Sequence, residues 1–459
     1  MILSALKRTA RSAIGLVPYD WRFGGAIYRR LLRELDERGR VDEERLADAQ
    51  SESLRWWIGH AVETVPFYGR LFAEAGLSAA SIREPRDLAR LPFLDKETVR
   101  AAGESLASRA VPRGAWVHTA TGGTSGRPLG FYVERRVSRQ REWAFMHTQW
   151  KRVGYALDAR VAALRNHVLP PDRLYEYNPR TRTLVLDPFR LTPRNVRQYV
   201  EAMRRHEVRF LHTYPSAAAT LLRFAAEAGV DPRSGVRVVL ASSENVYPGQ
   251  REGIERGLDA RFFSWYGHSE QLVLAGECAH DARYHAFPQY GVLELIDDAG
   301  RVIEQDGVMG EIVGTGFNNR VMPFLRYCTG DFARYAPGRC TCGLPYRRIE
   351  SVAGRWRQEM IVTADGGLVS MTALNMHSDC FDRVRQFQFV QEEPGVLELH
   401  LVPAEQFAEA DEAQLARELG AKLGTTRLVL RRVEEIARTE RGKHRFLIQR
   451  LPIDLGGGA

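Results

Sequence analysis

The chain has 459 residues and a mass of 52.0 kDa, a length that predicts two or three domains with a core that needs no disulfide or metal support. Hydrophobic residues make up 44% and charged residues 27% of the chain, which excludes an intrinsically disordered protein. The formal net charge is +8, but no run of five basic residues occurs and arginines stand beside acids throughout. Nucleic-acid binding is therefore not indicated, and a net charge of this size suits small anionic molecules equally well.

The cysteines and the apolar runs indicate a cytoplasmic protein. Five cysteines at irregular spacing argue against a disulfide framework and for a reducing compartment. No apolar stretch approaches 18 residues, so no membrane span is expected. Residues 1–30 are basic and weakly amphipathic, which leaves a peripheral membrane contact as an alternative.

The first part of the chain, residues 1–110, is predicted to be mainly helical. SESLRWWIGHAVETV has apolar residues at helical spacing and stops at Pro66, and a second helix should begin after Asp95. From Trp116 the pattern changes to a strand (WVHTA), a loop rich in glycine and hydroxyl groups, a second strand (GFYVERR) and a helix from Val137 to Arg152.

The remaining chain predicts an α/β fold. Three short apolar runs, VRFLHTYP, VRVVLASSE and ARFFSWYG, are separated by helical segments, as in a sheet flanked by helices. GVLELIDDAGRVI and GEIVGTGF are expected to form a hairpin with Asp298-Ala299-Gly300 as its turn. RQFQFVQ, GVLELHLV, ADEAQLARELGAKL and RLVLRRVEEI predict a small β-β-α-β unit. We therefore expect a large N-terminal domain over residues 1–353 and a small α+β domain over 354–459.

A loop of glycines and hydroxyl groups lies between the first two predicted strands. Backbone N–H groups and hydroxyls of such a loop can form an anion nest for phosphate oxygens. The ending of a Walker A loop is absent, and a flexible surface loop is the alternative. The loop residues are Thr121, Gly122, Gly123, Thr124, Ser125, Gly126 and Arg127, followed by Pro128.

Four later segments carry further candidate residues. Tyr266, Gly267 and Glu270 end an apolar strand, and an aromatic ring with a carboxylate there could stack a base and hold Mg²⁺; a strand-end turn with a core tyrosine is the alternative. Asp331 follows a glycine turn and could accept ribose hydroxyls or cap its own backbone. The last two segments are Gly354-Arg355 and Arg441-Gly442-Lys443.

Taken in this order, the five segments resemble the adenylate-forming superfamily. The chain is most similar to its phenylacetate–CoA ligase branch, which includes the CapK-type proteins named for capsular polysaccharide biosynthesis. The stretches AVETVPFYGRLF, LPFLDKETVR, LHTYPSAAATLL, SSENVYPGQREGIE, MPFLRYCTGD and GRWRQEMIV carry the resemblance, which spans about residues 50 to 450.

The resemblance implies a role for each segment. Thr121 to Arg127 would clamp the β- and γ-phosphates of ATP, and Ser243, Glu244 and Asn245 would line the adenine and substrate pocket. Tyr266 would stack on adenine and Glu270 would bind Mg²⁺. The remaining implied contacts are ribose at Asp331, ribose or phosphate at Arg355, and the α-phosphate or the substrate carboxylate at Lys443.

Two departures from the family pattern stand out. Arg127 takes the place of a more usual lysine, which still supplies a cation for phosphate. After Arg355, three residues precede Glu359, so the hinge residue cannot be assigned. The basic segment keeps both Gly442 and Lys443, which predicts that the catalytic lysine is retained.

Three cysteines and a histidine form a candidate structural zinc site. Cys278, His285, Cys340 and Cys342 would give four ligands and leave no open position for catalysis. The resemblance aligns His285 rather than His280. Unrelated cytosolic thiols are the alternative, because Cys-x-Cys spacing is less specific than Cys-x-x-Cys.

The expected function is an ATP-dependent ligase that forms an acyl-adenylate from a carboxylic acid, an aromatic one by family precedent, and passes it to CoA. A second hypothesis gives the adenylate to an amine or hydroxyl without CoA, and a third is a nucleotide-binding protein without ligase activity. His212 and His268 could each line the substrate pocket or serve the core. The sequence leaves a homodimer open.

Overall fold

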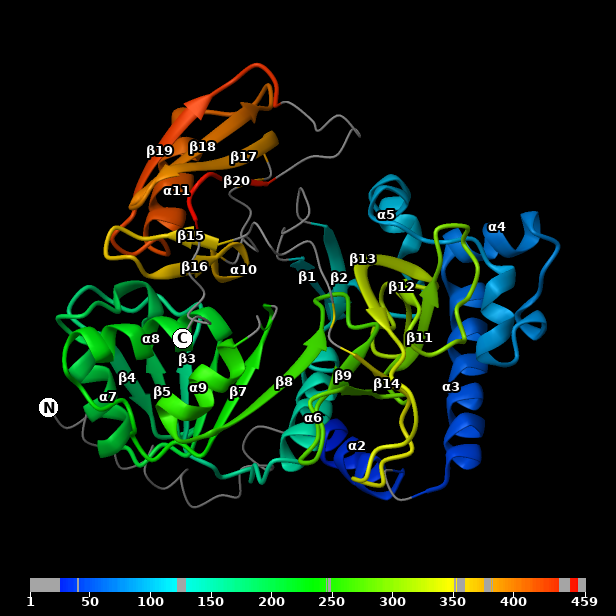
Figure 1. Ribbon diagram of the computed structural model, residues 1–459. Coiled ribbons are helices and arrows are strands. Elements are labelled where there is room, and N and C mark those ends of the chain that lie inside the picture. The colour runs from blue at the N-terminus through cyan, green and yellow to red at the C-terminus, as the bar shows by residue number, and fades with distance from the viewer. Residues whose placement is uncertain are drawn as a thin grey trace, which may run out of the picture.

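The computed structural model describes most of the chain (Figure 1). The described residues are 25–38, 41–121, 129–244, 246, 249–350, 352, 360–374, 381, 383–436 and 446–452. They form a mixed α/β structure with several sheets, which confirms the predicted fold class. Among them, no helix has the length and apolar character needed to cross a membrane.

A nine-stranded sheet forms the centre of the molecule, in the order β14-β10-β9-β8-β7-β6-β3-β5-β4. Its parallel part consists of β5, β3, β6, β7 and β8, so the three predicted apolar runs are confirmed as the adjacent strands β6, β7 and β8. The strands are β3 (Val161–Leu164), β4 (Tyr175–Asn178), β5 (Thr183–Leu186), β6 (Phe210–Thr213), β7 (Val238–Ser242), β8 (Arg261–Gly267), β9 (Leu274–Gly276), β10 (Tyr284–Ala286) and β14 (Arg348–Ile349).

Helices cover both faces of this sheet, which explains why β7 is a continuous apolar run. Val239 and Ala241 of β7 belong to the cluster formed with α7 (Val196–Arg205), α8 (Pro215–Glu227) and α9 (Gln250–Leu258). Val238 and Leu240 point to the opposite side, where α2 (Gly25–Arg38) and α6 (Ser138–Lys151) supply the apolar partners. Because successive side chains of a strand point to opposite faces of the sheet, β7 contributes to the hydrophobic cores on both faces.

The N-terminal part is helical, as predicted. It comprises α2, α3 (Glu43–Thr64), α4 (Pro66–Glu74), α5 (Lys96–Ala102) and the 3-10 turns Ala79–Ser81, Pro85–Arg90, Gly103–Leu106 and Arg113–Ala115. Asp95 caps α5, because its side chain accepts a hydrogen bond of 2.7 Å from the Thr98 backbone N–H. Pro66 lies beyond the end of α3 and is itself the first residue of α4, a position that needs no backbone donor.

Two smaller sheets lie beside the large one. β1 (Trp116–Ala120) and β2 (Gly130–Glu134) form an antiparallel hairpin. β11 (Gly291–Ile296), β12 (Met309–Gly316) and β13 (Tyr327–Arg334) form a three-stranded antiparallel sheet. The pairing of β11 with β12 is confirmed, but the predicted turn at Asp298–Gly300 only folds Val302 back onto Ile296 by an isolated bridge. The strand partner β12 begins further along, after a second turn.

The C-terminal part has its own four-stranded sheet, in the order β19-β18-β17-β20, with α11 (Glu409–Gly420) packed against β19 (Figure 1). The predicted β-β-α-β order is confirmed, and β20 adds a fourth strand parallel to β17. The strands are β17 (Val384–Glu393), β18 (Val396–Pro403), β19 (Arg427–Arg432) and β20 (Leu447–Gln449), preceded by β15 (Met360–Val362), β16 (Leu368–Ser370) and α10 (Met371–Leu374). The boundary predicted at Gly354 lies outside the described residues.

Candidate functional site

The side chains of Tyr266 and Asp331 meet where β8 and β13 come together. The Tyr266 hydroxyl donates a hydrogen bond of 3.0 Å to Asp331 Oδ2. Burial raises the pKa of the Asp331 carboxyl, although His268 and the Tyr266 hydrogen bond oppose that rise. Burial and the adjacent Asp331 charge also raise the pKa of Tyr266 well above its usual value, so the phenol stays a donor. Two residues assigned to one nucleotide by the resemblance are therefore in contact.

A bulge in β13 presents Asp331. The register between β12 and β13 shifts at this point, and Gly330 has a positive φ of 79° that favours glycine. The Asp331 backbone N–H is satisfied by the Thr329 hydroxyl at 3.1 Å, and the carboxylate accepts from Tyr266 instead of capping its own backbone. This geometry favours the binding alternative for Asp331, because its other oxygen remains for a ligand.

Glu270 is buried close to this pair and is held by two neighbours. Tyr327 donates from its hydroxyl to Oε1 at 3.1 Å, and His268 Nδ1 lies 3.2 Å from Oε2. Burial works to raise the pKa of Glu270, but the hydrogen bond and charge of His268 and the charge of Lys96 leave it below its usual value. The carboxylate is thus ionised at neutral pH and offers the oxygen ligands that Mg²⁺ prefers. His268 contacts the site through this carboxylate.

Tyr327 is a site residue that the sequence reasoning missed. It lies within the MPFLRYCTGD stretch, four residues before Asp331, and it is fully buried. A tyrosine among apolar residues is typical of a core position, so only its place in that stretch could have drawn attention to it.

The β1–β2 hairpin positions the start of the predicted phosphate loop. The backbone N–H of Thr121 donates to the Leu129 carbonyl at 3.0 Å, and the Thr121 hydroxyl accepts from the Leu129 N–H at 3.0 Å. The hydroxyl can still donate its own proton to a phosphate. Gly122 to Arg127 lie outside the described residues, so their phosphate contacts stay a prediction.

Ser243 and Glu244 follow the carboxyl end of β7. Ser243 has a left-handed backbone with φ 68°, a strained conformation that is found mainly at functional sites. The Glu244 carboxylate accepts from the backbone N–H of Ser216 at 3.0 Å and from its hydroxyl at 2.9 Å, at the start of α8. Asn245, Arg355 and Lys443 lie outside the described residues.

Arg165 lies beside Ser243 and was not singled out from the sequence. It follows β3 directly, contacts His212 Nε2 at the end of β6, and donates to the Ser243 hydroxyl at 3.4 Å. Its guanidinium also lies 4.8 Å from the centre of the Tyr214 ring. Burial, reinforced by the Arg165 charge, lowers the pKa of His212 well below its usual value, so the imidazole is neutral. His212 thus borders a polar cluster as well as the core.

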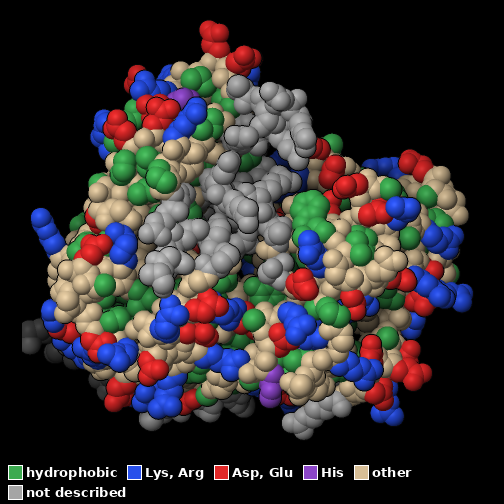
Figure 2. Space-filling model, viewed as in Figure 1, with side chains coloured by type: hydrophobic (Ala, Val, Ile, Leu, Met, Phe, Trp, Pro, Cys, Tyr) green, Lys and Arg blue, Asp and Glu red, His purple; other side chains and the backbone are tan. Residues whose placement is uncertain are grey.

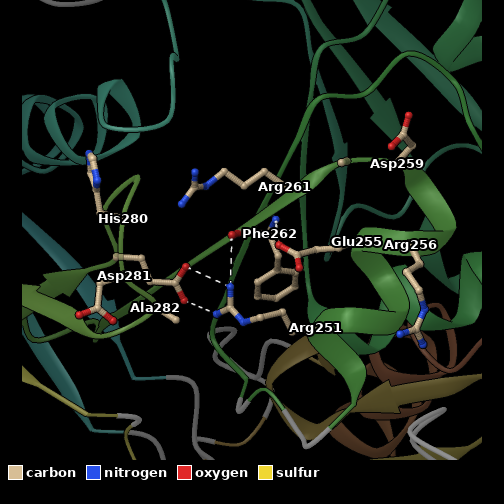
Figure 3. Close-up of a pocket in the computed structure, with 11 residues that line it drawn as sticks. Arg251, Glu255, Arg256, Asp259, Arg261, Phe262, His280, Asp281 and Ala282 are labelled. Atoms are coloured by element: carbon tan, nitrogen blue, oxygen red, sulfur yellow. Dashed lines mark hydrogen bonds and ion pairs between the residues drawn. The ribbon is translucent and has the colours of Figure 1, made fainter. Parts of the chain in front are cut away.

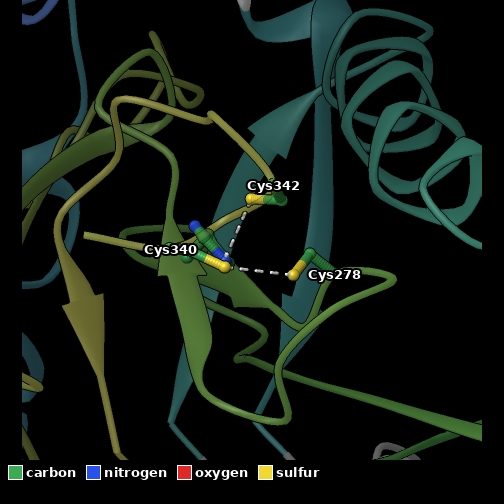
Figure 4. Close-up of side chains that lie close together, drawn as sticks. Cys278, Cys340 and Cys342 are labelled. Atoms are coloured by element: carbon green, nitrogen blue, oxygen red, sulfur yellow. Dashed lines mark hydrogen bonds between the residues drawn. The ribbon is translucent and has the colours of Figure 1, made fainter.

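The predicted zinc ligands come together in space (Figure 4). The ligand atoms of Cys278, His285, Cys340 and Cys342 all lie within 4.8 Å of one another. Cys278 follows β9, His285 lies on β10, and the two other cysteines belong to the segment before β14. Burial lowers the pKa of His285 to about 3, so its imidazole is in the neutral, ligating form.

The spacing of this cluster fits a tetrahedral zinc ion. Cys278 Sγ is 3.6 Å from Cys340 Sγ, and Cys342 Sγ is 3.7 Å from His285 Nε2. Bonds of about 2.3 Å to sulfur and 2.0 Å to nitrogen at tetrahedral angles place such atoms about 3.5–3.8 Å apart. His280 does not belong to this group; its backbone N–H donates to Cys278 Sγ at 3.3 Å.

An open depression of about 630 Å³ lies where β8 begins, at the other end of this strand from Tyr266 (Figure 3). It is lined by α9, the start of β8 and the segment between β9 and β10, including Arg251, Arg261 and Asp281. Arg251 pairs there with the buried Glu277, so the two charges satisfy each other. Because Tyr266 ends β8 and Arg261 begins it, this depression is separate from the Tyr266–Asp331 site.

Comparisons with known proteins give the chain its class. Residues 361–450 match the CapK C-terminal domain family. The 2-hydroxyisobutyryl-CoA ligase crystallised with 2-HIB-AMP and CoA in the thioesterification state has the same fold, with a TM-score of 0.62, 22% identity, and 90% of this chain and 91% of that chain covered. The chain therefore has the fold of this ligase.

Sequence relatives narrow this class. The phenylacetate–coenzyme A ligase of Thermus thermophilus is 28% identical over 343 residues, which cover 70% of this chain and 73% of that protein. Protein CapK of Staphylococcus aureus is 21% identical over 426 residues, which cover 88% and 90%. The predicted resemblance to the phenylacetate–CoA ligases and CapK is confirmed, and these relatives bear out the expected class of ATP-dependent, AMP-forming ligase.

Proposed function

We propose that this protein activates a carboxylic acid with ATP as an acyl-adenylate and then transfers the acyl group to the thiol of CoA. The observation that carries the proposal is the double contact between the end of β8 and β13, Tyr266 with Asp331 and Glu270 with Tyr327. It supports the proposal because it brings Asp331, the candidate for ribose binding, close to the ionised carboxylate of Glu270. The names of the relatives, phenylacetate–coenzyme A ligases among them, support the choice of CoA as acceptor.

In the first step, the substrate carboxylate attacks the α-phosphorus of ATP and pyrophosphate leaves. Asp331 would accept the ribose hydroxyls with its free oxygen, while Tyr266 holds that carboxylate and covers the adenine. Glu270 would bind Mg²⁺, which neutralises negative charge on the phosphates when it is bound. The hydrogen bonds from Tyr327 and His268 fix the orientation of this carboxylate.

The other assigned residues complete this proposal. Thr121 to Arg127 would clamp the departing phosphates, and Lys443 would neutralise charge at the α-phosphate. Arg355 would contact ribose or phosphate between a domain of residues 1–353 and a lid of residues 354–459. In the second step, the thiol attacks the acyl carbon and AMP leaves, with the lid in a different position. A zinc ion on the Cys/His group would be structural.

A second candidate function keeps the adenylate but changes its acceptor to an amine or a hydroxyl. The observation in its favour is the match to CapK, which extends over 88% of this chain and includes the C-terminal CapK family domain. Thioester formation that needs CoA separates the first candidate from an amide or ester formed without it.

The test is pyrophosphate release from ATP and Mg²⁺ over a panel of aromatic and aliphatic acids, with and without CoA. Asp331→Asn removes a charged acceptor worth about 1.5–3 kcal/mol, so ATP binding should weaken about 10- to 150-fold. Glu270→Gln should raise the Mg²⁺ requirement instead. Asp306→Asn, an exposed carboxylate paired with Arg347, is the matched control and should change neither. Failure of every acid together with no ATP binding would refute the proposed function.

A further inference from the structure

Hydrogen-bond donors gather at the carboxyl ends of three adjacent parallel strands. Arg165 follows β3, His212 is near the end of β6, and Ser243 follows β7. The arginine contacts the other two side chains, so the three form one cluster. In open α/β sheets, ligands bind at the carboxyl ends of the strands, which makes this edge a natural substrate position.

An aromatic wall closes one side of the cluster. The rings of Trp150, His212 and Trp265 lie 5.3–5.6 Å apart, centre to centre. Trp150 is 2% exposed, and its indole N–H has no hydrogen-bond partner among the described residues. A buried donor without a partner is costly, which indicates that an acceptor belongs next to it when the site is filled.

The charge of Arg165 has no direct ion-pair partner within the described part of the chain, and the charge of the described carboxylate Glu244 acts on the neighbouring Tyr214 phenol. Arg165 is half-buried, and none of the described ion pairs includes it. Its neighbours are a neutral imidazole, a hydroxyl and the Tyr214 ring, and none of these carries a negative charge. Glu244, the carboxylate next in sequence to Ser243, is turned to Ser216. Cations removed from water are normally paired, so a planar guanidinium here calls for an anion that the described residues do not supply, and a ligand is the partner we infer.

The cluster lies on the same edge of the sheet as the Tyr266–Asp331 contact, but one to three strands away from it. Ser242 of β7 pairs with Trp265 of β8, one residue before Tyr266. An acid whose reacting carboxylate lies beside the nucleotide would extend its other end towards this cluster, where an anionic group would pair with the Arg165 guanidinium.

We propose that the substrate acid carries a second anionic group, as in a dicarboxylic acid, and that Arg165 binds it with Ser243 and the Trp150 indole as further donors. This inference rests on the proposed function for the chemistry at the other end of the acid. It makes Arg165 a specificity-determining residue, because an acid that lacks the second anion would leave the guanidinium unpaired.

The experiment compares diacids with their monoamides. Glutarate, adipate and benzene-1,4-dicarboxylate are each tested beside the monoamide of the same acid, by pyrophosphate release and by calorimetry in the presence of AMP. We expect the wild-type protein to favour at least one diacid by about 10- to 150-fold, the contribution of a hydrogen bond between charged groups. Arg165→Gln should abolish that preference, and Arg165→Lys should restore part of it. Arg209→Gln, at the opposite end of β6, is the matched control.

The outcomes separate this inference from the proposed function. Pyrophosphate release with monocarboxylic acids, unaffected by Arg165→Gln, would overturn the inference and leave adenylation intact. A rise in KM for ATP rather than for the acid in Arg165→Gln would also overturn it. If no acid releases pyrophosphate, the calorimetric difference between diacid and monoamide still decides: a difference that Arg165→Gln removes supports the anion site, and equal binding refutes it.

Discussion

Replacing Cys340 by serine tests the candidate zinc centre. The four ligands come from the end of β9, from β10 and from the segment before β14, so a bound ion would cross-link parts of the chain that are far apart in sequence. A serine hydroxyl is not ionised at neutral pH, and Cys340→Ser therefore removes one of the four ligands. The effect should appear as loss of bound metal together with loss of stability.

The size of the loss follows from the binding equilibrium. A metal present at 100 to 1,000 times its dissociation constant stabilises the folded protein by about 3–4 kcal/mol. The strands that carry or flank the ligands are already paired in the large sheet, so we expect the protein to fold without the metal and to be stabilised by it. We expect the free energy of unfolding to fall by about 3–4 kcal/mol and the melting temperature by roughly 3–5 °C.

Elemental analysis and scanning calorimetry provide the assay. Wild-type protein should contain about one zinc ion per chain, and a chelator should lower its melting temperature to that of Cys340→Ser. Cys328→Ser is the matched control, because this thiol lies on β13 and is not a member of the cluster. Wild-type protein without zinc, or equal destabilisation by both substitutions, would refute the metal assignment.

Three further predictions test other parts of the molecule. Lys443→Ala should reduce adenylate formation by several powers of ten and leave ATP binding, measured by calorimetry, nearly intact. Arg326→Met should lower the free energy of unfolding in urea by about 3–5 kcal/mol, because it leaves the buried Glu294 carboxylate without its cationic partner. Glu398→Gln should cost about 1 kcal/mol at pH 7. Hydrogen bonds from Arg431 and from a histidine lower the pKa of Glu398 to about 2, so its stabilisation is complete above the ordinary carboxyl pKa and disappears as the pH falls towards 2.

Each of these predictions has its own control. Full activity of Lys443→Ala would show that the lid lysine is wrongly assigned, and Lys422→Ala should behave as wild type. Arg334→Met, on the exposed end of β13, should be near neutral; a similar loss there would attribute the Arg326 effect to the strand rather than to the ion pair. A Glu398→Gln difference that persists unchanged at pH 2 would contradict the pKa argument.

Local signals in the sequence predicted the regular elements well. The cap at Asp95, the helix after the β1–β2 hairpin and the parallel strands β6, β7 and β8 follow from residue type and spacing alone. The short strands β9, β10 and β14, of two or three residues each, carry no periodic pattern, and only their long-range pairing defines them. The chain does turn at Asp298–Gly300, but the strand that pairs with β11 begins later than predicted.

The candidate site was predicted where the resemblance supplied positions and missed where contacts are made across the fold. The three cysteines and the histidine that the resemblance aligned lie close together in the structure, and the histidine is His285, not His280. Tyr327 and Arg165 were missed because each resembles an ordinary residue in its own segment. Their roles arise only when β13 meets β8, or when the ends of β3 and β7 lie side by side.

On the face shown in Figure 2, Lys and Arg side chains are interspersed with Asp and Glu side chains over the described residues. On such a surface, long-range attraction of an anionic substrate would be weak. Recognition of ATP and of the acid should therefore depend on short-range contacts within the site, and association should change little with ionic strength.

The contacts of Tyr266 with Asp331 and of Tyr327 with Glu270 join the large sheet to the three-stranded sheet near the end of β8. At the other end of β13, backbone hydrogen bonds join it to the strand β14 of the large sheet. Near the end of β8 the two sheets are held by these side-chain contacts, and both tyrosines bind carboxylates that a nucleotide complex would use. Ligand binding should thus stabilise the packing of the two sheets against each other. Without nucleotide, the three-stranded sheet should open more readily in hydrogen exchange, and with nucleotide the two sheets should unfold as one cooperative unit.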